Sequence, residues 1–378
     1  MIYFDNAATT RILPEVIEEM NKSFEEHWGN PSSTHRQGQK SRAAIEKSRE
    51  TIAKLLQVDA KEIIFTSGGA ESNNLILRGA LKVNESKGKH LITSKIEHST
   101  VLRTCQALEK EGYEVTYIDV TERGVIDLEQ LKNAIRNDTV VISVMYVNNE
   151  TGVVQPIDEI AKMIEGKGIV LHTDAVQGVG KEMILPKKQG IHALSAAAHK
   201  FYGPKGTGFL YLDQNCMIEK EITGGSQERN RRSGTENVHG IVGMAKALEI
   251  VYSDMEEEQA KEKEMQIYLE EALKKEICNI KINCGNSRRI SSVVNITLED
   301  CNVQTLMVAL DMEGICVSGG SACMSGAMET SHVLKAMGAS EEDLKSSIRV
   351  SIGRYNTKDE IDIFIQKLKE IVARERAK

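Results

Sequence analysis

A lysine that directly follows an apolar run is the residue of this 378-residue chain whose setting most clearly suggests chemistry. The run from Ile191 to Ala198 predicts a short buried strand, and His199 and Lys200 come after it. A Gly-Pro turn then leads to a second strand, so Lys200 stands where open α/β sheets bind ligands. A lysine held there beside small residues can lose its proton and form a Schiff base with a carbonyl. A surface lysine in a Gly-rich turn would have the same local sequence. The rest of the chain has to distinguish this alternative from a Schiff-base lysine.

Other polar residues follow predicted strands in the same way. Strands alternate with helices between residues 62 and 212, which predicts an α/β fold with a mostly parallel sheet and helices on both faces. The carboxyl ends of parallel strands share one edge, so we expect the polar residues there to converge. They are Glu71, His98, Asn149, Asp174, Gln177, His199 and Lys200.

Three of these positions suggest binding of an anion or of a flat cofactor ring, and each has a plainer alternative. The Gly-rich turn from Ser67 to Ser72 precedes a helix expected over Asn73 to Leu81, and free N–H groups at such a start bind anions. Asp174 could keep a pyridine nitrogen protonated, or it could cap a helix. His98 could stack on a ring or act as an acid–base group, or it could be a capping histidine.

Arginine and cysteine supply the remaining candidates. Arg349 lies on an alternating segment, where it would clamp a carboxylate or form a surface ion pair. The arginines before Thr235, at positions 229, 231 and 232, suit either anion binding or surface charge. Cys323 lies among Gly, Ser and Ala, which predicts an exposed, mobile thiolate nucleophile, whereas Cys316 has apolar neighbours typical of a structural cysteine.

Composition limits the classes of function. The formal net charge of −7 argues against direct nucleic-acid binding, and no apolar run approaches a membrane span. The first residues lack the features of a signal peptide. The seven cysteines are scattered, which predicts neither a disulfide framework nor a zinc site, and no other metal site is expected. A cytoplasmic location is therefore expected.

We expect two domains and an arm. Residues 14–257 would form the large cofactor-binding domain and residues 258–378 a smaller α+β domain, with the N-terminal arm, 1–13, packed on it. The charged stretch from Tyr252 to Lys275 predicts a long surface helix that connects the two domains.

Taken together, these motifs resemble the cysteine desulfurases of the NifS/IscS type, which belong to the class-V aminotransferases. The resemblance covers nearly the whole chain. The matching segments are Tyr3 to Thr10, Gly29 to Ser33, Thr66 to Ser72, Glu97 with His98, Val147 to Glu150, His172 to Gln177, His199 with Lys200, Arg232 to Thr235, Gly320 to Cys323, and Ser347 to Arg349.

The resemblance implies a pyridoxal 5'-phosphate enzyme of fold type I that removes sulfur from L-cysteine. Lys200 would hold the cofactor as a Schiff base, and Cys323 would take the sulfur as a persulfide, leaving L-alanine. The sulfur would pass to an acceptor protein for iron–sulfur cluster, thio-cofactor or tRNA synthesis, and Cys323 would meet an iron–sulfur cluster only on a bound scaffold.

The resemblance also implies a role for each remaining position. Asp174 would pair with the pyridine nitrogen, His98 would stack on the ring and act in catalysis, and Arg349 would bind the substrate carboxylate. The other cofactor contacts would be Gly69, Ala70, His199 and Thr235 at the phosphate, and Gln177 and Asn149 at the phenolic oxygen or the substrate. Thr235 would come from a second subunit, which implies a homodimer.

Two residues depart from the family pattern. Ala70 stands where a threonine is usual and Ala197 where a serine is usual, so two hydroxyls that would bond the phosphate are missing. Two alternatives follow: a selenocysteine lyase or another fold-type I enzyme, and a degenerate, non-catalytic partner protein.

Overall fold

A seven-stranded sheet forms the centre of the larger part of the molecule. The computed structural model describes residues 1–320 and 330–377. In this part of the chain the sheet has the order β2–β8–β7–β6–β5–β3–β4, and every strand except β8 runs in the same direction. The strands are β2 (Ile63–Thr66), β3 (His90–Ser94), β4 (Glu114–Ile118), β5 (Thr139–Ser143), β6 (Val170–Asp174), β7 (Ala193–Ala197) and β8 (Gly208–Leu212). The predicted mostly parallel sheet is confirmed.

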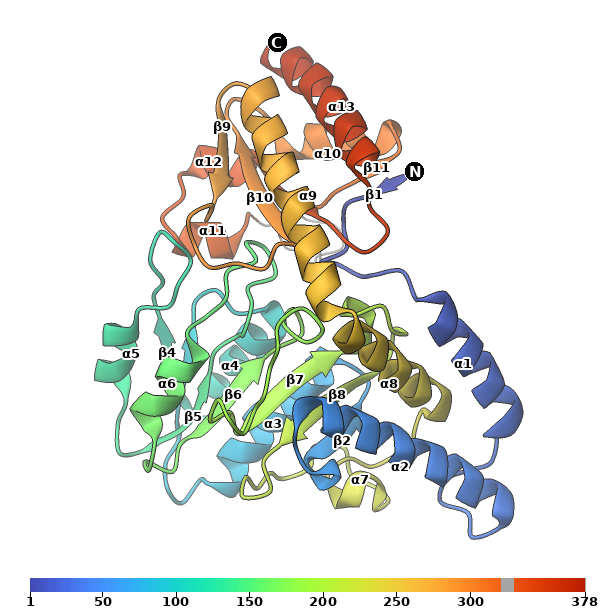
Figure 1. Ribbon diagram of the computed structural model, residues 1–378. Helices are drawn as coiled ribbons and strands as arrows, with labels where there is room; N and C mark the ends of the chain where they lie inside the picture. Colours follow the sequence, from blue (N-terminus) through green and yellow to red (C-terminus); the bar gives the residue numbers. More distant parts are fainter. Residues whose placement is uncertain (321–329, 378) are drawn as a thin grey trace.

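Helices cover both faces of this sheet because successive side chains of its strands point to opposite sides. Leu91, Val141 and Leu210 pack under α3 (Gly69–Val83) and α4 (Ser99–Lys110). Their neighbours Ile92, Ile142 and similar residues face the opposite layer. That layer consists of α1 (Pro14–Glu26), α2 (Arg36–Leu56), α5 (Leu128–Ala134), α6 (Ile157–Ile164) and α8 (Val238–Ser253), as Figure 1 shows.

A second apolar core lies above the first in Figure 1. Its sheet is antiparallel, with β10 (Val293–Leu298) between β9 (Ile280–Asn283) and β12 (Ser347–Ser351). The core is completed by α9 (Met255–Glu276), α10 (Val303–Met312) and α13 (Lys358–Arg376). The short helices α11 (His332–Ala336) and α12 (Glu341–Lys345) precede β12.

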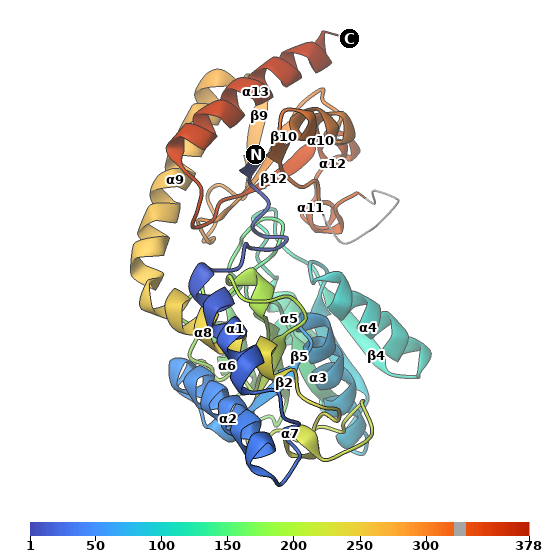
Figure 2. The ribbon, with the colours of Figure 1, turned by 90° about the vertical axis from the view of Figure 1, so that its right-hand side faces the viewer.

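The N-terminal arm connects the two cores. β1 (Ile2–Tyr3) pairs in parallel with β11 (Ile315–Cys316), and Phe4 is fully buried in the second core. Ala7 and Leu13 already belong to the first core. The two views agree on this course, with the arm running from the upper core down to α1 (Figures 1 and 2).

Two expected elements differ from the structure. The helix predicted from Tyr252 to Lys275 is present as α9, but it begins at Met255 because the chain turns after α8 ends at Ser253. It is not a solvated link, since Met265, Leu269 and Leu273 are buried in the second core. The helix expected from Asn73 begins at Gly69, because a glycine turn can pass straight into a helix without a capping side chain. Among the described helices, none has the length and apolar character needed to cross a membrane.

The second core depends on the buried face of α13, which gives a matched test. Ile361 is fully buried, whereas Ile363, two residues further along the same helix, is 49% exposed. Truncating a buried isoleucine costs about 2–5 kcal/mol, whereas exposed positions usually change stability by less than about 0.5 kcal/mol. We expect Ile361→Ala to lower the thermal midpoint by about 2–6 °C in a calorimetric scan. Ile363→Ala should leave it nearly unchanged, and equal shifts would contradict this packing.

Candidate active site

Six of the seven polar residues predicted to converge line one cavity at the carboxyl edge of the central sheet. Its volume is about 510 Å³, within the range of small-molecule sites. A hollow of about 660 Å³ lies between α1, α2 and α8, but its charged lysines and glutamates face solvent on helix surfaces away from the strand ends. The cavity at the sheet edge is therefore the candidate site. Its lining includes Gly69, Ala70, His98, Asn149, Asp174, Gln177, His199, Lys200 and Arg349.

Lys200 lies in the cavity wall, in the 3₁₀ turn Ala198–Lys200 that directly follows β7. Its Nζ atom donates hydrogen bonds to the carbonyl oxygens of Ala7 (2.6 Å) and Ala8 (2.8 Å) in the N-terminal arm. The same Ala7 oxygen accepts from Gln177 Nε2 at 2.8 Å. The arm thus holds the side chains of Lys200 and Gln177 in the cavity wall.

Asp174 is the last residue of β6 and is almost fully buried. Its Oδ2 atom accepts a hydrogen bond from Asn73 Nδ2 at 2.7 Å, and its Oδ1 atom accepts from the N–H of Val176 at 3.1 Å. A buried carboxylate needs such donors to stay ionised. The contact with Val176 is a local turn interaction. No helix lies between β6 and β7, a stretch that the structure describes throughout, so the alternative of a helix cap is wrong here, and Asp174 lines the cavity wall instead.

His98 is the N-cap residue of α4, so the plain alternative of a capping histidine is correct for this residue. Its Nδ1 atom accepts from the N–H of Thr100 at 3.2 Å and lies 2.9 Å from Thr100 Oγ1. With Nδ1 accepting, the proton of the neutral imidazole belongs on Nε2. Thr100 Oγ1 also accepts from Asn73 Nδ2 at 2.9 Å, so Asn73 links the histidine and Asp174 through one amide group.

The first turn of α3 supplies an anion site to the same cavity. Gly69 and Ala70 are its first two residues, and the leading N–H groups of a helix have no acceptor within the helix. A Cβ atom on Gly69 would lie 2.6 Å from Val176 Cγ2, so only glycine fits there. Glu71, expected in the convergence, instead forms an ion pair with Arg232 at 2.8 Å.

Burial keeps two titratable groups near this edge neutral. Burial, with the nearby charges of Lys200 and Lys205, lowers the pKa of His199 to about 4, and its Nδ1 atom lies 3.2 Å from Thr9 Oγ1. Burial also raises the pKa of Glu97 to about 8. Glu97 Oε1 accepts hydrogen bonds from Ser94 Oγ and from the N–H of Met145, which fixes the turn that precedes His98.

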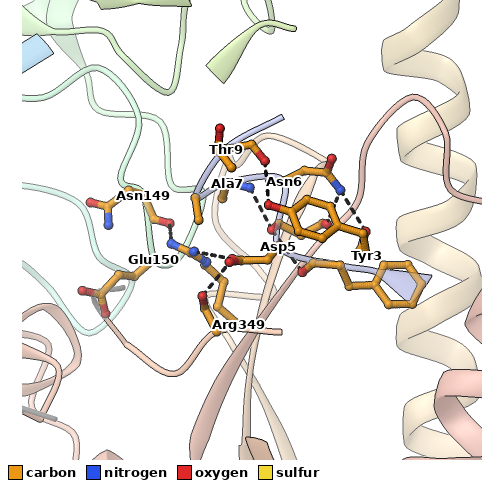
Figure 3. A network of polar contacts seen from close by, with 12 residues as sticks. Tyr3, Asp5, Asn6, Ala7, Thr9, Asn149, Glu150 and Arg349 are labelled. Atoms are coloured by element: carbon orange, nitrogen blue, oxygen red, sulfur yellow. Dashed lines mark hydrogen bonds and ion pairs between the residues drawn. The ribbon is translucent and has the colours of Figure 1, made fainter. Parts of the chain in front are cut away.

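Arg349 reaches the cavity from β12 in the second core. Its guanidinium is 2% exposed and donates to the backbone oxygen of Asn149 and to Asp5 Oδ1, both at 2.9 Å. Figure 3 shows the group between these two partners. The inward-facing arginine predicted from the sequence is confirmed, and its neighbours exclude the alternative of a surface ion pair.

Two predicted site residues are not in this cavity. Thr235 is exposed in the loop before α8, which agrees with its expected role only if a second subunit is present. Cys323 lies outside the described residues. Cys316 is half-buried at the end of β11, and burial raises the pKa of its thiol.

Comparison with known proteins identifies the family. The family model described as aminotransferase class-V matches residues 2–364. A protein of Dictyoglomus turgidum named "Cysteine desulfurase IscS" is 44% identical over 375 residues, which cover 99% of this chain and 95% of that protein. The chain belongs to the cysteine desulfurases of the class-V aminotransferase family.

Solved structures of the family agree with the fold. A structure described as a NifS-like protein is 37% identical and superimposes with a TM-score of 0.93, covering 98% of this chain and 99% of its own. Another, "SspA in complex with cysteine", is 36% identical with a TM-score of 0.83, covering 94% of this chain and all of its own. The predicted class of fold and the predicted resemblance are both confirmed.

The residues that line the cavity fit the cofactor of this family. Gln177 Oε1 is a buried polar atom with no hydrogen-bond partner among the described residues, as expected of an atom that pairs with a bound molecule. The anion site at Gly69 suits a phosphate, Asp174 suits a protonated ring nitrogen, and Lys200 suits a carbonyl carbon. Ala70 and Ala197 also line the cavity, so the two usual hydroxyls are absent from the phosphate end.

The residues that position these groups were not among the site residues predicted from the sequence. Asn73 is completely buried within the apolar face of α3, and a polar residue in an apolar stripe was the available signal. Thr100 has no such signal, since a threonine in the first turn of a helix is ordinary. Asp5 lies in the N-terminal arm, and no local pattern indicates its partner, which is 344 residues away.

The raised pKa of Glu97 makes a prediction about stability. Between about pH 5 and about pH 8 the folded protein keeps a proton on this carboxyl that the unfolded chain releases, so the carboxyl lowers stability as the pH rises. Glu97→Gln removes this effect while keeping the shape. We expect its thermal midpoint, relative to the parent, to improve steadily over that range.

The control is Glu257→Gln at an exposed position of α9, which should show no such trend. A constant difference between Glu97→Gln and the parent at every pH would mean that Glu97 is ionised in the folded protein.

Proposed function

We propose that this protein is a pyridoxal-phosphate-dependent cysteine desulfurase, a sulfurtransferase that converts L-cysteine to L-alanine. The observation that carries the proposal is the meeting of Lys200, Asp174 and His98 around one cavity whose other end is the start of a helix. Membership of a family whose members are named for this reaction supports it. A relative solved with cysteine supports the choice of substrate.

Each residue of the cavity would have its own role in binding the cofactor, binding the substrate or moving a proton. Bound pyridoxal phosphate supplies an electron sink for negative charge at the Cα atom of an amino acid. Asp174 would hold the proton on the ring nitrogen, and Asn73 keeps that carboxylate in place. His98 would cover the ring, and Lys200 Nζ would bind the cofactor and carry the proton from Cα. Arg349 would hold the substrate carboxylate, with Asn149 and Gln177 beside it.

The phosphate would be held mainly by backbone groups. The N–H groups of Gly69 and Ala70 point from the start of α3, and the neutral His199 ring offers one N–H donor. Thr235 of a second subunit would add a hydroxyl, which makes the active form a homodimer. Each hydroxyl missing at Ala70 and Ala197 would otherwise contribute a bond to a charged group worth about 1.5–3 kcal/mol.

Cys323 would then take the sulfur. Its thiolate forms an S–S bond with the substrate sulfur, the substrate Cβ–S bond breaks, and the carbon takes up a proton. The products are alanine and a persulfide on Cys323, so no external oxidant or reductant is needed. The persulfide sulfur would pass to an acceptor protein such as an iron–sulfur scaffold or a thiolation protein. We infer a cytoplasmic setting, because this exchange requires reduced thiols.

The role of Lys200 is tested by substitution. Lys200→Ala should abolish formation of alanine from L-cysteine, because the proton at Cα loses its base and the cofactor loses its covalent anchor. Alanine is measured by chromatography, and the absorption band of lysine-bound cofactor is recorded in parallel. Lys82→Ala, at an exposed position near the end of α3, is the control and should keep the parent rate. Substantial turnover by Lys200→Ala would refute the assignment.

The choice of nucleophile is tested with two cysteines. Cys323→Ser should bind cofactor and cysteine yet form no protein persulfide, whereas Cys316→Ser should form it normally, because burial keeps the Cys316 thiol protonated. Mass spectrometry of the intact chain after addition of L-cysteine detects the extra sulfur atom. The reverse pattern would identify Cys316 as the nucleophile.

A further inference from the structure

The guanidinium of Arg349 is already paired before any substrate carboxylate binds. It is 2% exposed, and two of its nitrogens donate: Nη1 to the backbone oxygen of Asn149 and Nη2 to Asp5 Oδ1. Its third nitrogen, Nε, is buried and has no hydrogen-bond partner among the described residues. The group therefore holds a carboxylate of its own chain and still keeps an unused donor.

Asp5 is itself fixed at this position. Its Oδ1 atom also accepts a hydrogen bond from Ser318 Oγ at 2.8 Å, and the backbone of Ser318 pairs with that of Arg349. The arm residues on either side are anchored, since Phe4 is buried in the second core and Ala7 N donates to Ser351 Oγ at 2.9 Å. Figure 3 shows the Asp5 carboxylate facing the guanidinium from the arm. The pair belongs to the folded scaffold and does not depend on a ligand.

We propose that Asp5 is an internal counter-ion of Arg349 that sets the affinity of the site for amino-acid carboxylates and keeps it low. The proposal rests on the proposed function in one respect, which is that Arg349 receives the substrate carboxylate. That carboxylate and Asp5 then share one buried cation, so the two anions repel each other across it.

The sign of the effect follows from the burial of the pair. A buried cation without a counter-ion carries a desolvation cost in free energy. An anion that binds and neutralises the cation removes this cost, which strengthens its binding. Asp5 supplies the neutralisation in advance, so an arriving carboxylate gains less. Cysteine and alanine carry the same amine and carboxylate, so a strong carboxylate site would retain the product as well as capture the substrate. An arginine that is already paired would orient the carboxylate while allowing the product to leave.

Equilibrium binding tests the proposal without turnover. Isothermal titration calorimetry on the cofactor-loaded enzyme would compare L-alanine with ethylamine, which is alanine without its carboxylate. We expect Asp5→Asn to bind L-alanine about tenfold more tightly than the parent does, equivalent to about 1.4 kcal/mol. Ethylamine should bind both proteins equally within about twofold. Cofactor absorbance and the thermal midpoint verify each protein, and Asp5→Ser is a second charge-removing variant should Asp5→Asn fail to fold.

Two controls separate the possible outcomes. Asp254→Asn removes the carboxylate from another arginine pair, Arg354–Asp254 at 2.8 Å, and should leave the L-alanine affinity unchanged. Arg349→Gln should weaken L-alanine but not ethylamine, and if it does not, the carboxylate assignment in the proposed function fails together with this inference. If Arg349→Gln behaves as expected while Asp5→Asn leaves L-alanine binding unchanged or weaker, the inference about Asp5 alone is overturned. Equal tightening of both ligands would also overturn it.

Discussion

The hydrogen bonds between Lys200 and the N-terminal arm are the interaction around which the active site is built. The carbonyl oxygens of Ala7 and Ala8 are acceptors that a protonated lysine needs when it is withdrawn from water. The arm presents them there because its two ends are buried in different cores, with Phe4 in the second and Leu13 in the first. These contacts join residues that are far apart in sequence. They offset the conformational entropy lost in ordering the arm only when both cores are formed. The lysine environment therefore depends on the folding of the whole chain.

Electrostatic balance explains how the cavity would take up the two anions of the proposed function without a large cluster of exposed cations. Burial neutralises His199 and Glu97, so neither ring nor carboxyl adds charge at neutral pH. A phosphate would rely on the N–H groups at the start of α3, whose partial charge needs no counter-ion. A substrate carboxylate would rely on Arg349, whose charge is already balanced by Asp5. Each anion would therefore meet a preformed site with little unbalanced charge.

Local sequence signals predicted the residues at strand ends, because an apolar run that stops at a polar residue reports both burial and position. Asp174 and Lys200 were found in this way, and the parallel sheet placed them at a common edge. Arg349 was found because alternation within a strand sets which way a side chain points. The start of α3 was placed four residues too late, since a glycine pair resembles a turn and carries no capping side chain to mark the helix.

What sequence could not give is pairing over long distances. Asp5 meets Arg349 only because β12 and the arm are brought together by strand pairing and by the burial of Phe4, and no short-range pattern encodes that. The same holds for Asn73, whose place in an apolar stripe signals burial but does not name its partners, Asp174 and Thr100. In both cases the chemistry-bearing residue is recognisable by type and position, whereas its positioning partner is defined only by geometry. Residues that act directly on a ligand can thus be proposed from a sequence, but the groups that adjust their charge and orientation require the fold.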